Sequence, residues 1–255
     1  MRIYVCVKHV PDTAANIKIV GEAGYDTKVK YVANPYDEYG VEEAISLVAE
    51  AGEGEVIAVC VGNTGAANTL RAVMAMGVNR GILVKTDEQF LSSEFTAKIL
   101  GRAIKEDGRP DLVFTGKQSV DSEGMQTPYH LGAQLSFPVV TGVMDFKLED
   151  SKAIVQIEIG GGVREVLEVK TPCIIGATKG LNEPRYPKLP DILKAKKKEI
   201  KQIPLEDLGL DRTDLCKLKK LDPVKERSSA RMLKGSTDEI VTSLIKILKE
   251  EEKVI

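Results

Sequence analysis

Polar side chains that could bind a nucleotide gather in one stretch of the sequence, residues 115–132. The stretch reads Thr-Gly-Lys-Gln-Ser-Val-Asp-Ser-Glu-Gly-Met-Gln-Thr-Pro-Tyr-His-Leu-Gly, a glycine loop and an acidic turn that lead into an expected helix. A phosphate at that helix N-terminus would meet free amides and the side chains of Gln126 and Thr127, and Asp121 could bind a ribose hydroxyl. An ordinary strand-loop-helix corner would show the same pattern, so both interpretations stay open.

Residue types for hydrolytic or metal chemistry are scarce. The only histidines are His9 and His130, and neither has a metal-ligand residue four positions later, which argues against a zinc site. The sequence contains no GxSxG, HExxH or GxxxxGK[ST] motif. It therefore predicts no metal site and no nucleophilic or acid/base catalytic centre, so the chain is not expected to be an enzyme by itself.

The elements that would position these residues follow an alternating pattern. Short apolar runs predict strands that are buried on both faces, at residues 3–7, 56–61, 81–84, 112–115 and 173–177. Helical patterns with one apolar face lie between them, at residues 38–50, 69–76 and 93–104. The alternation predicts an α/β fold with a mainly parallel, Rossmann-like sheet and helices on both faces. Ligands bind beyond the carboxyl ends of such strands, which directs attention to the loops at 8–13, 62–65 and 116–121.

The pattern changes in the second half of the chain. Residues 146–148, 153–159 and 163–169 predict an antiparallel hairpin region. From Lys179 onward, prolines punctuate a charged segment without strand character. We therefore expect an α/β adenine-nucleotide-binding domain over residues 1–180 and a C-terminal arm over residues 181–255. Ser236 and Glu239 have capping-box spacing and predict an amphipathic terminal helix, which suits either a partner or the chain's own domain.

Charge and composition exclude several classes of partner. A formal net charge of -2, with 29% charged residues, gives no field that would recruit nucleic acid or an anionic membrane. The lysine run between residues 194 and 201 is not interleaved with aromatic residues, so we expect a solvated surface there, or one that steers acidic protein partners.

Cysteine usage and the beginning of the chain bear on the compartment. Three of the four cysteines, at positions 6, 60, 173 and 216, lie in apolar runs, and no CxxC motif occurs, which predicts buried free thiols in a reducing compartment. The chain begins with a strand-like run and has no secretory leader, and no apolar stretch approaches the roughly 20 residues of a membrane span. We therefore expect a cytoplasmic bacterial or archaeal protein without membrane insertion.

The sequence resembles the electron transfer flavoprotein beta family along nearly its whole length. The matching segments are Val7-Lys8-His9-Val10, Asn34-Pro35-Tyr36-Asp37-Glu38, Val41-Glu42-Glu43-Ala44, Ala75-Met76-Gly77, Gly116-Lys117-Gln118 with Asp121 and Gln126-Thr127, Gly161-Gly162, Leu181-Asn182-Glu183-Pro184-Arg185-Tyr186, Leu189-Pro190 and Lys194-Ala195-Lys196-Lys197-Lys198. The resemblance implies an adenine nucleotide alpha hydrolase-like fold and a heterodimer with a larger alpha subunit that carries the redox FAD. It also implies a carrier that takes electrons from acyl-CoA dehydrogenases in fatty acid oxidation and passes them to a quinone oxidoreductase.

The resemblance further implies an adenine nucleotide in this subunit, which is AMP in most members and a second FAD, reduced by NADH, in electron-bifurcating members. The positions that match cofactor-binding segments are Cys6, Asn34, Pro35, Tyr36, Asp37, Val61, Asp121, Ser122, Gln126, Thr127 and Pro128, with Thr13 and Tyr36 expected nearest the flavin. The residues at 11–13 resemble bifurcating relatives, whereas those at 34–38 resemble the AMP type, so the nucleotide stays open. Pro128 replaces a glycine of many members, which removes one N–H for a phosphate.

The family's docking loop for acyl-CoA dehydrogenases corresponds to residues 181–200 here. Leu189 takes the place of the apolar anchor, beside Pro190, Lys194 and Lys197. A leucine flanked by prolines is a suitable knob for a partner's pocket, although it could instead pack on the subunit's own surface. A function of another class, a nucleotide-sensing module of the universal-stress type, would share the α/β layout, form homodimers and have no use for this segment.

Overall fold

The computed structural model describes residues 1–211, 218–223 and 229–255. Contacts divide the chain into two compact units, Met1–Leu221 and Asp222–Ile255. The first unit contains the sheet and the helices that cover it, and the second contains the terminal helix.

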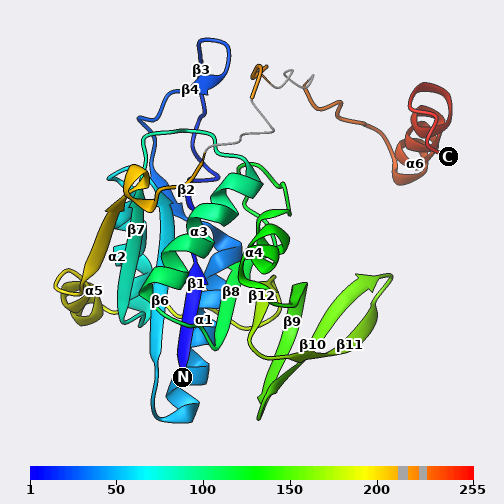
Figure 1. Cartoon of the computed structure of the whole chain (residues 1–255). Coiled ribbons are helices and arrows are strands. Elements are labelled where there is room, and N and C mark those ends of the chain that lie inside the picture. Colours follow the sequence, from blue (N-terminus) through cyan, green and yellow to red (C-terminus); the bar gives the residue numbers. More distant parts are fainter. Residues whose placement is uncertain (212–217, 224–228) are drawn as a thin grey trace. The chain divides into compact units, whose positions relative to one another are not determined.

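One large sheet organises the first unit. Its strands are β1 (Arg2–Cys6), β6 (Glu55–Gly62), β7 (Arg80–Lys85), β8 (Leu112–Gly116), β9 (Val139–Glu149), β10 (Lys152–Gly160), β11 (Val163–Lys170), β12 (Cys173–Ala177) and β13 (Ile200–Pro204). Their order is β11-β10-β9-β12-β8-β1-β6-β7-β13 (Figure 1). Pairing is parallel from β9 across to β13, and antiparallel among β9, β10 and β11. The predicted mainly parallel sheet with an antiparallel hairpin region is confirmed.

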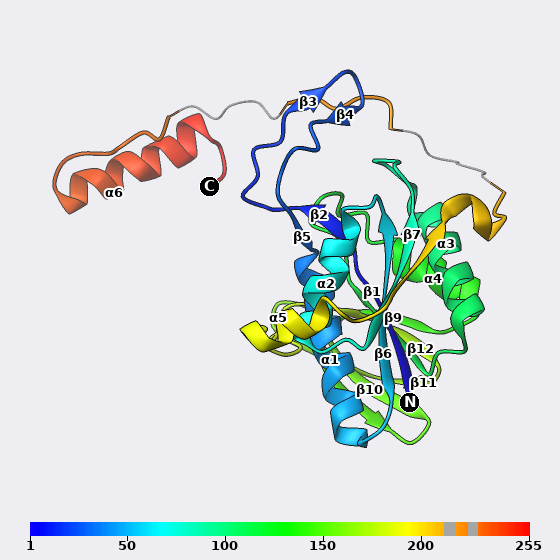
Figure 2. The same ribbon diagram turned by 90° about the vertical axis from the view of Figure 1, so that its left-hand side faces the viewer.

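Helices cover both faces of the sheet. They are α1 (Pro35–Ala51), α2 (Ala66–Met76), α3 (Ser93–Asp107), α4 (Thr127–Leu135), α5 (Leu189–Ala195) and the short 3-10 helix η1 (Leu205–Leu208). Figure 2 shows α1, α2 and α5 on one side of the sheet and α3 and α4 on the other. The predicted helices on both faces are therefore confirmed.

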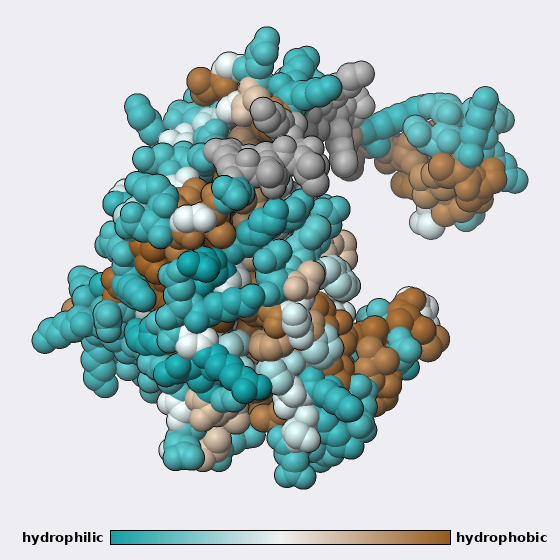
Figure 3. All heavy atoms as spheres, in the orientation of Figure 1, coloured by the Kyte–Doolittle hydropathy of each residue, from teal (hydrophilic) through white to brown (hydrophobic). Residues whose placement is uncertain are grey.

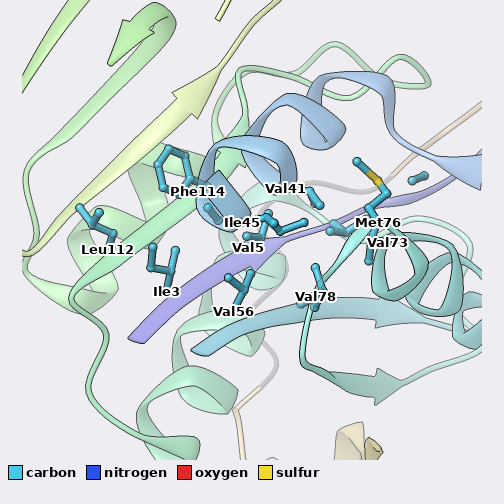
Figure 4. Close-up of a cluster of buried hydrophobic side chains, with 14 of the residues drawn as sticks. Ile3, Val5, Val41, Ile45, Val56, Val73, Met76, Val78, Leu112 and Phe114 are labelled. Carbon is cyan, nitrogen blue, oxygen red and sulfur yellow. The ribbon is translucent and has the colours of Figure 1, made fainter. Parts of the chain in front are cut away.

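The continuous apolar character of the central strands follows from this double cover. In β1, Ile3 and Val5 pack toward α1 and α2, as the close-up in Figure 4 shows, while Tyr4 packs toward α3 and α4. Val41 and Ile45 of α1 lie on the first of these faces. Each strand side chain is removed from water on one face or the other, which is the main source of stability in such a fold.

The hairpin continues the sheet beyond its helical cover. The first half of β9 pairs in parallel with β12 and the second half pairs antiparallel with β10, so this strand begins earlier than the predicted 146–148. Val155 and Val169 are buried, whereas Ile159, Val163 and Val166 toward the tip are exposed. Figure 3 shows the apolar surface over this region.

The expectation that strand character ends at Lys179 is wrong at one place. Residues Ile200–Pro204 form β13, which pairs in parallel with β7 at the edge of the sheet. Only Ile203 of this strand is buried, so its sequence lacks the continuous apolar run of an inner strand. An edge strand that exposes most of its side chains leaves little signal in the sequence.

Two small antiparallel pairs precede α1. Strand β2 (His9–Pro11) pairs with β5 (Tyr31–Ala33), and β3 (Ile19–Val20) pairs with β4 (Gly24–Tyr25). The segment between β1 and α1 therefore contains short strands, although only a loop was expected after β1.

The second unit contains α6 (Thr237–Lys246) and a short π-helical turn, η2 (Ile247–Glu251). The predicted capping box is present, since the Ser236 hydroxyl accepts from the Glu239 amide and the Glu239 carboxylate accepts from the Ser236 amide. No residue of α6 is buried, and Val241, Leu244 and Ile245 are exposed.

Two sequence predictions on thiols and membranes can be compared with the described residues. Cys6, Cys60 and Cys173 are buried and free, as predicted, and Cys216 lies outside the described residues. Within the described ranges, no helix has both the length and the apolar character to cross a bilayer.

Candidate functional site

A pocket of about 660 Å³ lies beyond the carboxyl ends of β1, β6 and β8. Cys6, Val61 and Thr115 reach it from these three strands. Strands β6 and β7 follow on one side of β1, and β8 then lies on its other side. The order in which strands are added to the sheet therefore reverses at β1. Such a switch point is where open α/β sheets bind their ligands, and the volume suits a small organic molecule.

The pocket collects most of the residues that the sequence singled out. The lining includes Cys6, Thr13, Asn34, Asp37, Val61, Asp121, Ser122, Gln126, Thr127 and Pro128. Pro35 and Tyr36 are not part of the lining; they open α1, and the Lys117 ammonium lies 5.2 Å from the centre of the Tyr36 ring. Segments as far apart in the chain as Cys6 and Pro128 thus meet at one edge of the sheet, as the parallel topology requires.

Asp37 is a buried residue of the pocket lining. Its carboxylate oxygens accept hydrogen bonds from the backbone N–H of Lys8 (2.7 Å), the backbone N–H of Gly116 (2.8 Å) and the Asn34 carboxamide (2.9 Å). Burial raises the pKa of Asp37 to about 7, although these hydrogen bonds and the nearby Lys8 oppose the increase. Asn34 also donates to the Gln118 carbonyl oxygen (2.9 Å) and accepts from the Val120 amide (3.1 Å).

A group of donors and acceptors lies at the rim. The Lys8 ammonium is 2.7 Å from a carboxylate oxygen of Asp121 and 3.2 Å from the Ser119 hydroxyl, and the hydroxyls of Ser119 and Ser122 are 2.8 Å apart. Lys8 lies in the loop at 8–13 that the sequence analysis indicated, and it lines the pocket. An ammonium and two hydroxyls can bind phosphate oxygens, and a carboxylate can accept from ribose hydroxyls.

The N-terminus of α4 faces the same pocket. Gln126 is its N-cap residue but makes no side-chain capping bond, which leaves the amide of this side chain available to a ligand. Pro128 occupies the first turn and lacks an N–H, so one donor of this helix end is missing. Gln126 and Thr127 thus face the pocket with fewer backbone amides beside them than a glycine at 128 would give.

Thr115, the last residue but one of β8, carries an unsatisfied group. Its hydroxyl oxygen is buried and has no hydrogen-bond partner among the described residues. Thr115 also lines the pocket. A buried polar atom without a partner is unfavourable, so this hydroxyl offers a hydrogen-bonding group to any ligand of the pocket.

Aromatic residues also line the pocket, and of these only His9 lies in a segment that the sequence analysis singled out. His9 stacks on Tyr31 with ring centres 4.3 Å apart, and its Nδ1 lies 2.7 Å from the Thr69 hydroxyl. Tyr25 and Phe90 meet edge to face with ring centres 5.9 Å apart. Burial lowers the pKa of His9, which favours the neutral ring. Tyr25 and Tyr31 lie in the short strands β4 and β5, which are too short to show a periodic pattern in the sequence.

The segment that corresponds to the docking loop, residues 181–200, is here called the docking segment. It contains α5, from which Leu189 projects with 70% of its surface exposed, next to the partly exposed Ile192 and Leu193. Lys194 and Lys197 are exposed, together with Pro190. The alternative that Leu189 packs on the subunit's own surface is not what the structure shows.

The lysine run of the docking segment is not uniformly solvated, contrary to expectation. The Lys198 ammonium donates to the carbonyl oxygens of Met74 (3.0 Å) and Val78 (2.5 Å) at the end of α2. Burial lowers the pKa of Lys198 as a result. Arg71 of α2 donates in turn to the carbonyl oxygens of Ala195 (2.7 Å) and Lys198. These bonds fix the end of the docking segment to the body of the first unit.

Within residues 1–211, 218–223 and 229–255, no group of three His, Cys, Asp or Glu side chains is placed to bind a metal ion. Burial raises the pKa of the Cys6 thiol well above its usual range, and the nearby Asp37 and Cys60 raise it further. Cys6 is thus an apolar wall and not an activated nucleophile.

Comparisons with known proteins agree with this geometry. Residues 24–208 match a family described as electron transfer flavoprotein domain. The chain is 37% identical over 249 residues to the mitochondrial electron transfer flavoprotein subunit beta of Arabidopsis thaliana, which covers 96% of this chain and 97% of that protein. It is 33% identical over 262 residues to the subunit beta of Bacillus subtilis, covering 100% of both chains. The human subunit beta is 36% identical over 252 residues, covering 97% of this chain and 98% of that protein.

Proposed function

The chain belongs to the electron transfer flavoprotein family, and we propose that it is the beta subunit of a heterodimer. In this heterodimer a larger alpha subunit would make most of the contacts with the redox FAD. The FAD would supply the electron chemistry when bound. This chain would position the alpha subunit and its flavin and would present a surface to electron donors. Its own residues would orient and shield the cofactor and would not act as acid, base or nucleophile.

We further infer that the pocket holds a structural AMP. The observation that carries this inference is the convergence of complementary groups on one pocket, with the unpartnered Thr115 hydroxyl among them. Cys6 and Val61 offer apolar walls for an adenine ring, and Asp121 an acceptor for ribose hydroxyls. Gln126 and Thr127 at the start of α4 would bind the phosphate.

The docking segment supports the proposed exchange of electrons with other proteins. An exposed Leu189 between Lys188 and Pro190, with basic Lys194 and Lys197 nearby, offers an apolar anchor inside a positively charged rim. We propose that acyl-CoA dehydrogenases of fatty acid oxidation dock here and that a quinone oxidoreductase accepts the electrons. The proposed compartment is the cytoplasm.

A second candidate is a bifurcating subunit that holds its own FAD, reduced by NADH. The pocket favours this candidate in one respect, because it continues past the expected nucleotide end to Thr13, Tyr25 and Phe90. An aromatic wall of this kind could accept a second ring system. The nucleotide content of the purified complex separates the two candidates.

The heterodimer itself can be tested by co-expression with the alpha subunit encoded by the same organism. The proposal predicts a complex with equal amounts of the two chains and the visible absorbance of a bound flavin. A colourless homodimer of this chain in the presence of the alpha subunit would instead support the nucleotide-sensing alternative. The chain expressed alone is the control for flavin that binds without a partner.

A further inference from the structure

Asp37 joins two loops that come from different strands. The Lys8 amide follows β1 and the Gly116 amide ends β8, and the two donate to opposite oxygens of the same carboxylate. Asp37 is only 5% exposed. Two strand ends that must both border the pocket are therefore tied through one buried side chain at the start of α1.

Asn34 adds a third loop to this junction. Its carboxamide uses both donor hydrogens, one toward Asp37 and one toward the Gln118 carbonyl oxygen, and its oxygen accepts from the Val120 amide. Asn34 is 1% exposed. The loop that leads to Asp121 and Ser122 is thus anchored to the same helix start as the loops at residues 8 and 116.

The hydrogen-bonding capacity of the two side chains is almost fully used inside the protein. A carboxamide has two donor hydrogens, and both of those of Asn34 are engaged. What remains on Asp37 and Asn34 is acceptor capacity alone, which cannot bind a phosphate anion. Asn34 is also the N-cap residue of α1 but makes no side-chain capping bond. Its side chain instead bonds to the backbone of the loop at Gln118 and Val120.

The close approach at Gly116 fits the same junction. A Cβ at this position would collide with the Asp37 carboxylate and with the Cβ of Tyr36. The absence of a side chain at 116 lets the backbone amide reach the carboxylate at 2.8 Å. Position 116 thus requires glycine because Asp37 and Tyr36 occupy the space that a side chain would need.

We propose that Asn34 and Asp37 are positioning residues, which assemble the nucleotide pocket from the loops at 8, 116 and 118–120 and do not bind the nucleotide through their side chains. This inference rests on the nucleotide site of the proposed function and assigns a different role to two residues of that site. Lys8, Asp121 and Gln126 then present their groups to the ligand only while the junction is intact.

The Asp37→Asn variant of the full chain, in complex with the alpha subunit, tests the role directly. An amide in place of the carboxylate turns one acceptor into a donor, which must face the Lys8 or Gly116 amide. After removal of bound nucleotide, AMP should bind about tenfold more weakly or worse than to the wild-type complex in calorimetry. Hydrogen exchange at the Lys8 and Gly116 amides should accelerate in the absence of ligand. Asn34→Ala should accelerate exchange at Val120 and serves if Asp37→Asn does not fold.

Asp107→Asn is the matched control. Asp107 is also a carboxylate whose side chain is only 9% exposed, and it has strong partners, Tyr4 (2.7 Å) and Arg80 (2.6 Å), but it lies at the end of α3, away from the pocket. Its variant should lose stability and keep the AMP affinity and the slow exchange of the pocket amides. A general loss of stability therefore cannot imitate the expected result.

Several outcomes overturn the inference. Unchanged AMP affinity in both Asp37→Asn and Asn34→Ala would do so, with or without faster exchange, and so would weaker AMP binding without faster exchange at the loop amides, since that result would identify direct ligands. If the wild-type complex does not bind AMP, the proposed nucleotide is rejected, and the exchange measurement alone decides whether the junction positions the loops. Faster exchange at these amides would support the junction, and unchanged exchange would reject it.

Discussion

Glu42 and Arg185, which are 143 residues apart in the sequence, form the main link between α1 and the docking segment. The Glu42 carboxylate accepts from the Arg185 backbone N–H (3.0 Å), from Nε (2.8 Å) and from Nη2 (2.6 Å). Glu42 is 8% exposed, so the bonds lie largely out of water. Asn182 adds a bond to Glu43 (2.9 Å), one residue along the same helix. The helix that begins at the pocket therefore also fixes the segment proposed to dock partners.

Glu42→Gln should loosen the docking segment. The neutral amide cannot accept the two guanidinium bonds with the same strength, and one of its faces is now a donor that meets Arg185. We expect the free energy of unfolding to fall by roughly 1–3 kcal/mol, because a charge-assisted bond is lost in a buried setting. Hydrogen exchange over residues 181–188 should accelerate. Glu168→Gln, which breaks an exposed pair with Lys152, is the control and should change stability by less than about 1 kcal/mol.

The same pair predicts a dependence on acid. Burial pushes the pKa of Glu42 upward, but the bonds from Arg185 outweigh this and leave it below the ordinary value of a glutamate. A group whose folded pKa is lowered contributes stability above its unfolded pKa, about 4.3, and loses it as the pH falls through the folded value. The difference in unfolding free energy between wild type and Glu42→Gln should thus be constant near neutrality and shrink below about pH 4. A difference that already shrinks at neutral pH would contradict the assignment.

Leu189→Ala should slow reduction of the heterodimer by its dehydrogenase without any change in bound nucleotide. Truncation removes an apolar side chain that is 70% exposed and therefore contributes little to packing within this chain. We expect the KM for the flavoprotein to rise by about tenfold or more, with kcat nearly unchanged, as for a lost interface anchor. Val163→Ala is the control, since Val163 is also an exposed apolar residue (57%) but lies on the hairpin. Unaltered steady-state kinetics would remove Leu189 from the docking site.

Thr115→Val should separate binding from stability. The substitution removes a buried hydroxyl that has no partner among the described residues, so stability should stay the same or rise by up to about 1 kcal/mol. The affinity for AMP should fall about three- to tenfold if the nucleotide satisfies this hydroxyl. Thr141→Val, which removes a hydroxyl bonded to Tyr129 (2.7 Å), is the control and should leave AMP binding unchanged. An affinity equal to that of wild type would show that the ligand does not reach Thr115.

The parts of the fold that the sequence predicted are those with a local cause. The inner strands are apolar on both faces, so residues 3–7, 112–115 and 173–177 could be identified without knowledge of their neighbours. Because parallel strands end at the same edge, the loops after them could be assigned to one site. Strand β13 could not be found in this way, since its edge position leaves only Ile203 buried.

The parts that escaped prediction depend on contacts across long stretches of chain. Asn34 and Asp37 were expected to bind a nucleotide from the resemblance alone. Their partners within the chain include the amides of Lys8, Gly116 and Val120, which no spacing in the sequence can reveal. Lys198 looked like a member of a solvated run, but the carbonyl oxygens at the end of α2 bind it. Each of these side chains has a role set by what the fold places opposite.

The nucleotide content of the heterodimer tests the central claim most directly. The purified complex would be denatured and the released nucleotides quantified by chromatography and mass, with the chain concentration measured on the same sample. One FAD and one AMP for each heterodimer is the expected result. Two FAD and no AMP would contradict it in favour of the bifurcating candidate, and FAD without any nucleotide attributable to this subunit would contradict the assignment of the pocket itself.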